Sequence, residues 1–264
     1  MLESGIPGRM TGVERLDLFR PGCIMAAGRI RIPRGVPPMT MTSLLLTGLA
    51  IAAGYFFLTW LISVRIKNYG LLDAAWSYGV AILAPFYAWM GPGDATRKWT
   101  MTALGVAWSL RLGTYILRRV ISHHPAEDAR YQTLRARWPG SGMFLLFFQL
   151  QAVLVVIFSL PFLLMAFNPE PGLKTLEITG LAIALLSLGG ESLADAQMKA
   201  FKAHPGHKGK VCQNGLWRYS RHPNYFFESL HWIAYVPLAL GYLILTLPVA
   251  WLSHWLEKRF RHET

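Results

Sequence analysis

Long apolar runs of nearly constant length constrain the fold of this chain more than any other feature. Each approaches the ~20 residues that a helix needs to cross a bilayer, and none shows the alternation of a membrane β-barrel. Hydrophobic residues make up 53% of the chain and charged residues only 15%, which excludes an ordinary soluble domain. The sequence therefore predicts an all-α, multi-pass transmembrane bundle of six or seven helices. The clear runs are Leu44–Val64, Leu71–Met90, Trp99–Leu117, Met143–Phe167, Leu176–Ala194 and one that begins near Tyr225.

The last apolar stretch is long enough for more than one crossing. It extends from Tyr225 to Leu256 and contains Pro237, Gly241 and Pro248, each of which can break a helix. A hairpin of two short helices and one long kinked helix both satisfy this pattern, so the choice between six and seven helices stays open.

Positive charge lies between the apolar runs rather than along them. The formal net charge is +12, with arginines concentrated in residues 118–137 and lysines and arginines in residues 199–221. Two runs separate these segments, and the loop between those runs, NPEPGLKT, has almost no positive charge. Both basic segments are therefore predicted to be cytoplasmic, with the amino terminus outside, and the charge does not indicate nucleic-acid binding.

Residues 1–38 differ from the rest of the chain. They are polar and rich in Arg, Gly and Pro, which predicts a disordered or peripheral extension before a transmembrane domain over residues 39–264. Because a basic amino-terminal segment prefers the cytoplasm, translation is expected to start at Met39 or Met41. The two cysteines, Cys23 and Cys212, form no CxxC pair, so the sequence indicates neither a disulfide framework nor a zinc site.

The end of the fifth apolar run carries an acidic pair followed by cations. Glu191 and Asp195 are four residues apart, and Lys202 continues roughly along the same helical face. Such a face can hold ribose hydroxyls and phosphates together; the alternative is a set of ion pairs within the helix, such as Asp195 with Lys199. An HxxH motif follows in the loop, but no further ligand at a useful spacing completes a metal site, so no metal is predicted.

The stretch Gly215 to Glu228, GLWRYSRHPNYFFE, passes directly from a basic segment into an aromatic helix. Arg218 and Arg221 can engage phosphates or a carboxylate, and the Asn224 amide both donates and accepts hydrogen bonds. So many polar groups at the membrane surface indicate a ligand site. Pro223 suits the first turn of the helix that follows, which therefore begins with Asn224, Tyr225 and Glu228 on its first turns.

Taken together, ESLADAQMKAFK and GLWRYSRHPNYFFE resemble the carboxy-terminal domain of steroid 5-alpha-reductase-like membrane proteins, particularly their bacterial branch. The upstream segments LLDAAWSYG, WSLRLGTYILRR and EDARYQTLRARWPG are similar to the same branch, so the resemblance covers about residues 68–228. Its specificity lies in the combination, because isoprenylcysteine and related small-lipid methyltransferases carry a similar RHPxY motif.

The resemblance implies a helical bundle in a bacterial inner membrane that binds NADPH from the cytoplasm through residues 174–228. The implied reaction is reduction of a carbon–carbon double bond conjugated to a carbonyl, in a steroid-like or polyprenyl-like lipid that enters from the bilayer. The position that aligns with a tyrosine of animal steroid reductases is Trp108. The resemblance, together with charge and spacing, gives these cofactor-binding residues: Glu191, Asp195, Lys202, Arg218, Arg221, His222, Asn224, Tyr225 and Glu228.

Such a reduction needs a proton donor at the carbonyl, and three residues on earlier runs are candidate catalytic groups. Asp73 stands in an apolar run, which favours its protonated form; the alternative is an interfacial acid paired with Arg65 or Lys67. Arg111 and Tyr115 are one helical turn apart and share a face that can point into the bundle. For Arg111 the alternative is extension to the cytoplasmic edge of the membrane.

Two other functions fit the same motifs. One is a lipid methyltransferase that uses S-adenosylmethionine, and the other is a non-catalytic protein that keeps the fold. NADPH carries a pyrophosphate and a 2′-phosphate, which suit the cations of residues 199–221, whereas S-adenosylmethionine carries a sulfonium cation and no phosphate. The charge of this segment therefore favours the reductase.

Overall fold

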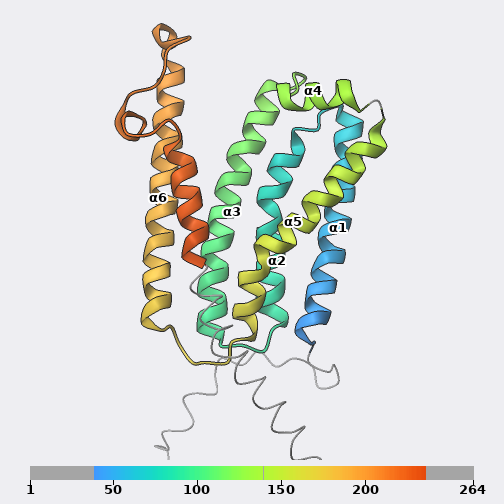
Figure 1. The fold of residues 1–264 in the computed structure, drawn as a ribbon, viewed down its shortest axis with the longest axis vertical. Coiled ribbons are helices and arrows are strands. Elements are labelled where there is room, and N and C mark those ends of the chain that lie inside the picture. The colour runs from blue at the N-terminus through green and yellow to red at the C-terminus, as the bar shows by residue number, and fades with distance from the viewer. Residues whose placement is uncertain (1–38, 139, 236–264) are drawn as a thin grey trace, which may run out of the picture. The chain divides into compact units, whose positions relative to one another are not determined.

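A computed structural model describes residues 39–138 and 140–235 of the chain (Figure 1). Within these ranges every regular element is a helix, as predicted. Besides the 3₁₀ turns η2 (Pro205–His207) and η3 (Gly215–Arg218), residues 223–235 form a helix whose continuation lies outside the described residues. The α-helices are α1 (Met41–Ile66), α2 (Leu71–Met90), α3 (Ala95–His123), α4 (Ala129–Arg137), α5 (Ser141–Phe167) and α6 (Thr175–Ala203).

Four helices are long and apolar enough to cross a membrane, namely α1, α2, α5 and α6. The chain is therefore an integral membrane protein. Helix α3 coincides with the third predicted run but continues past it to His123, and it is not among these four. Its continuation carries Arg118 and Arg119, which suit the aqueous edge better than the bilayer.

Helices α1, α2, α3 and α5 form the packed core. Helix α2 contacts α1, α3 and α5, and α1 also packs along α5. Fully buried aromatic and apolar side chains fill the space between them, including Phe56, Tyr87 and Phe148. Helix α2 is thus the central element, and residues near its start are held on several sides.

Helix α6 contacts the core at its first turn and the last described helix near its middle. At its first turn the buried Arg97 of α3 makes a two-point ion pair with Glu177, with nitrogen–oxygen distances of 2.5 and 3.0 Å. Arg97 also donates to the backbone carbonyl of Gly172, at 2.7 Å. Further along α6, the ring of Phe227 fills the space that a side chain at Gly190 would occupy. This glycine lets the helix of residues 223–235 lie close against α6.

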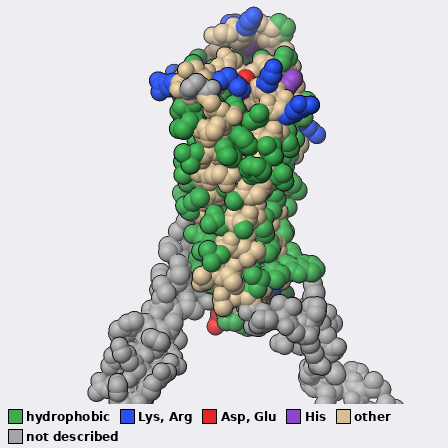
Figure 2. Space-filling model, turned by 90° about the vertical axis from the view of Figure 1, so that its right-hand side faces the viewer, with side chains coloured by type: hydrophobic (Ala, Val, Ile, Leu, Met, Phe, Trp, Pro, Cys, Tyr) green, Lys and Arg blue, Asp and Glu red, His purple; other side chains and the backbone are tan. Residues whose placement is uncertain are grey.

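The two basic segments lie at the same end of the bundle, as their charge predicted, and the loop of residues 168–174 lies at the other (Figure 1). Figure 2 shows Lys and Arg side chains gathered at the end that carries α4, above a surface that is largely hydrophobic. This distribution matches a bilayer around the middle of the helices and water at the basic end.

Several predictions concern parts of the chain outside the described residues. These are the extension over residues 1–38 and the break points Pro237, Gly241 and Pro248. The predicted start at Met39 or Met41 depends on that extension and also stays a prediction. The choice between a hairpin and one long helix after Tyr225 therefore stays a prediction.

Candidate functional site

A cavity of about 690 Å³ lies near the basic end of the bundle. Its lining comes from α2, α3, α4, α5 and α6, and from η3 and the helix that starts at residue 223. This volume falls within the range of small-molecule sites. Of the twelve residues predicted to bind or act on a ligand, nine line it: Asp73, Tyr115, Glu191, Asp195, Lys202, His222, Asn224, Tyr225 and Glu228.

Glu191 and Asp195 line one wall of this cavity and are held by an arginine from another helix. Arg111 of α3 forms an ion pair with Glu191 and places its Nη1 atom 2.8 Å from Oδ2 of Asp195. The Glu191 side chain is only 2% exposed, so its carboxylate is buried, whereas the Arg111 side chain is 20% exposed. The structure thus pairs Asp195 with Arg111 rather than with Lys199, and turns Arg111 into the bundle rather than to the membrane edge.

Segment 215–228 is fixed to α6 by hydrogen bonds that start at η3. The Trp217 indole donates to the carbonyl of Ala194 at 2.9 Å, and the Leu216 amide donates to Oε1 of Gln197 at 2.9 Å. Gly215 has a φ of +57° and lies against the Gln197 side chain, a conformation and a proximity that favour glycine. These contacts carry the chain back over α6 and place the RHPNY motif above the acidic pair.

Asn224 and Glu228 complete the polar wall from the first turns of the last described helix. The Asn224 amide nitrogen is 3.5 Å from Oδ1 of Asp195. Oδ1 of Asn224 and Oε2 of Glu191 are buried and accept no hydrogen bond from the residues that the structure describes. Buried acceptors without donors are costly in isolation. This wall therefore offers acceptors to a ligand that carries hydroxyl or amide hydrogens.

Asp73 lies across the cavity, at the start of α2, and is bound by α4. The Tyr131 hydroxyl donates to its Oδ1 at 2.7 Å, and Nη2 of Arg130 lies 2.7 Å from its Oδ2. The partner of Asp73 is thus Arg130 and not Arg65 or Lys67. Burial and the neighbouring Asp73 carboxylate raise the pKa of Tyr131. In this arrangement Asp73 accepts hydrogen bonds from two donors.

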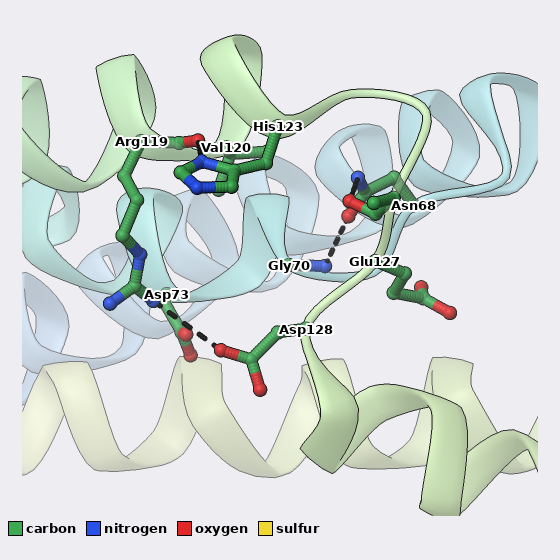
Figure 3. A pocket seen from close by; sticks show the side chains of 9 residues that line it. Asn68, Gly70, Asp73, Arg119, Val120, His123, Glu127 and Asp128 are labelled. Atoms are coloured by element: carbon green, nitrogen blue, oxygen red, sulfur yellow. Dashed lines mark hydrogen bonds and ion pairs between the residues drawn. The ribbon is translucent and has the colours of Figure 1, made fainter. Parts of the chain in front are cut away.

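Helix α4 and the loop before it form a network of ion pairs at the basic end of the bundle. Figure 3 shows a smaller pocket, of about 280 Å³, between α2, α3 and this loop. Arg119 reaches across it to Asp128, at 3.5 Å, and Glu127 accepts from the Tyr69 backbone amide at 2.6 Å. Asp73 and Arg119 line both cavities, so this network borders the main cavity.

A third cavity, of about 590 Å³, lies where α6 gives way to η2 and η3. It shares Lys202 and Trp217 with the main cavity. Lys208 and Lys210 also line it, together with His204 and His207, and its described lining contains no acidic residue. This cavity therefore extends the main site towards positive charge.

Three predicted residues lie apart from the cavity lining. Arg111 stands behind it, bonded to the acidic pair, whereas Arg218 and Arg221 are exposed. Trp108 is fully buried and stacks on His231, with ring centroids 5.3 Å apart, away from the lining. Several lining residues were not predicted from the sequence, among them Trp76, Arg119, Gln151 and Trp217. Of these, only Gln151 has a clear sequence signal, as an amide inside a strongly apolar run.

The fold and the site together define a class: a membrane-embedded helical protein with a polar ligand cavity at its basic end. A family model described as "Protein of unknown function (DUF1295)" matches residues 59–255. The chain therefore belongs to the DUF1295 family, which is the steroid 5-alpha-reductase-like family. No curated protein and no solved structure shows a significant match to the chain.

Proposed function

We propose that this protein is an NADPH-dependent reductase of a carbon–carbon double bond conjugated to a carbonyl in a hydrophobic lipid. One observation carries the proposal: a single cavity gathers nine of the predicted site residues from four separate parts of the chain. Membership of a steroid 5-alpha-reductase-like family supports the same reaction class. The location that we propose is a bacterial inner membrane, with the basic end of the bundle in the cytoplasm.

The donor and acceptor groups of the polar wall fit the cofactor that we propose. Glu191 and Asn224 each present a buried oxygen that accepts no hydrogen bond within the described residues, and these suit ribose hydroxyls or a carboxamide. Lys202 links this wall to the basic cavity of Lys208 and Lys210, which suits phosphates. When bound, NADPH supplies a hydride to the β-carbon of the enone.

Hydride addition places negative charge on the carbonyl oxygen, and this charge needs a donor. Tyr115 lines the cavity, is 40% exposed and offers its hydroxyl to a ligand there. Asp73 is hydrogen-bonded to Tyr131 and Arg130. We therefore propose that it orients these two donors at the cavity wall and does not itself transfer a proton. Arg111 holds Glu191 and Asp195 in place from behind. The substrate that we propose is steroid-like or polyprenyl-like and enters from the bilayer.

Cofactor binding to the detergent-purified full chain tests this proposal. NADPH is expected to bind and S-adenosylmethionine is not, as measured by calorimetry with each cofactor in turn. Asn224→Ala removes one hydrogen-bonding group and should weaken NADPH binding by about threefold to tenfold. Asn214→Ala is the matched control, because Asn214 precedes η3 and does not line the cavity. Binding of S-adenosylmethionine without NADPH would establish the methyltransferase and end the reductase proposal.

A further inference from the structure

Helix α5 is almost wholly apolar, and its few polar side chains can be accounted for one by one. After its first residue the only hydrogen-bonding side chains are Gln149, Gln151 and Ser159. The Ser159 hydroxyl donates to the carbonyl of Val156 at 2.8 Å, which satisfies it within the helix. The two glutamines remain, and each is costly in a membrane span unless it finds a partner.

The two glutamines face different surroundings because a helix turns about 200° in two residues. Gln149 donates to the carbonyl of Ala53 on α1 at 3.4 Å, so it serves the contact between α1 and α5. Gln151 lines the main cavity, and its amide has no hydrogen-bond partner among the residues that the structure describes. It lies about 15 Å along α5 from Ser141, well inside the apolar part of the helix.

The surroundings of Gln151 differ from the opposite wall of the cavity. Phe147, one turn before it on α5, and Leu72 and Trp76 on α2 line the same side. The hydroxyl of Ser77, also on α2, donates to the backbone carbonyl of Asp73 at 3.1 Å. The charged groups of α6 and of the helix after residue 223 belong to the other wall. Asp73 and Arg130 also line this side of the cavity, but they are paired with each other. Beside them, one uncharged amide among apolar and aromatic side chains suits a ligand with an apolar body and a single carbonyl or hydroxyl oxygen.

We infer that Gln151 is a specificity-determining residue, whose amide hydrogen-bonds the oxygen of the lipid substrate and orients its apolar body along α2 and α5. The assignment rests on the proposed function in treating the lipid as a substrate, but the recognition itself requires no cofactor. It separates the cavity into a charged wall for one ligand and an apolar wall, with Gln151, for the other.

The test compares oxygenated ligands with hydrocarbons of closely similar shape that lack the oxygen that Gln151 is proposed to bind. Two pairs serve as probes: cholest-4-en-3-one with cholest-4-ene, and farnesal with farnesene. Binding to the detergent-purified full chain is followed without NADPH by tryptophan fluorescence, because Trp76 and Trp217 line the cavity. In at least one pair the wild type should bind the oxygenated member about threefold to tenfold more tightly.

The variants then assign this preference to one side chain. Gln151→Leu should bind both members of the pair alike, whereas Gln151→Asn, a shorter amide, should retain part of the preference. Gln149→Leu is the matched control and should keep the full preference, because Gln149 faces α1. Thermal unfolding and calorimetric NADPH binding are recorded for every variant, so that a folding defect or a failed reductase proposal is seen separately.

Three outcomes overturn the assignment: no preference or no binding in either pair by the wild type, an unchanged preference in Gln151→Leu, or an equal loss in Gln149→Leu. If NADPH fails to bind while Gln151→Leu still removes the preference, the reductase proposal fails and the recognition role of Gln151 stands.

Discussion

Replacement of Arg111 by methionine should be among the most destabilising single changes in this cavity. The arginine is the shared cation of Glu191 and Asp195, whose side chains are 2% and 12% exposed. Methionine keeps most of the volume but leaves two poorly solvated carboxylates without their counter-charge. Breaking a buried pair from one side costs about 3–5 kcal/mol. For a protein of this size, such a loss lowers the unfolding midpoint by roughly 6–20 °C.

The assay is thermal unfolding of the detergent-purified protein, followed by helical circular dichroism. Arg118→Met is the matched control, because Arg118 is exposed on the same helix and makes no ion pair with the described residues. It should change the free energy of unfolding by less than about 0.5 kcal/mol. The double variant Arg111→Met with Glu191→Gln should recover much of the loss, since it removes the more buried of the two charges.

Either of two results would contradict this role of Arg111. If Arg111→Met costs less than about 1 kcal/mol, the cluster behaves as a solvated surface ion pair. If the double variant is no more stable than Arg111→Met alone, the loss does not come from the uncompensated carboxylate, and the charge argument for this wall is wrong.

Two further predictions concern the ends of the bundle. Arg97→Met should lower the free energy of unfolding by about 3–5 kcal/mol, because the buried Glu177 then lacks its counter-charge. Chemical denaturation should show a higher free energy of unfolding for the double variant that also carries Glu177→Gln than for Arg97→Met alone. At the other end, hydrogen bonding from Arg130 lowers the pKa of Asp128, so its contribution to stability is present above the unfolded pKa, about 3.9, and is lost as the pH falls through the folded value. The protection factors of the α4 amides, corrected for the intrinsic exchange rate at each pH, should therefore be lower at pH 3 than at pH 5, and equal protection factors would contradict this account.

The helices themselves were largely predictable from the sequence. The run Leu71–Met90 was predicted with the limits that α2 shows, because glycines flank it on both sides and mark where the apolar pattern ends. Helix α3 was predicted too short, since hydropathy detects only its apolar part. A helix that continues into water through Arg118 and Arg119 loses that signal without losing its backbone hydrogen bonds.

The partners of the polar side chains were not predictable to the same degree. Spacing showed that Glu191 and Asp195 share a helical face, but it could not show which helix that face meets. The structure supplies Arg111, which is 84 residues from Asp195, and likewise joins Asp73 to Tyr131 across 58 residues. Local alternatives such as Asp195 with Lys199 were reasonable on sequence, because contacts within a helix depend only on spacing, whereas contacts between helices depend on how each is rotated about its axis.

The two walls of the cavity explain which residues the sequence revealed. The charged wall comes from α6 and the segment that folds back onto it, so its groups are close in sequence and form a motif. The apolar wall is assembled from α2 and α5, whose contributions, such as Trp76 and Gln151, are far apart and look like ordinary membrane helix. A continuous motif suits the cofactor, whose structure does not vary. A wall whose residues come from separate helices can be altered by single substitutions, which suits a variable lipid substrate. We therefore expect substrate preference to depend on α2 and α5 and cofactor preference on residues 191–228. Substitution of Gln151 alone should then alter lipid binding and leave NADPH binding unaltered.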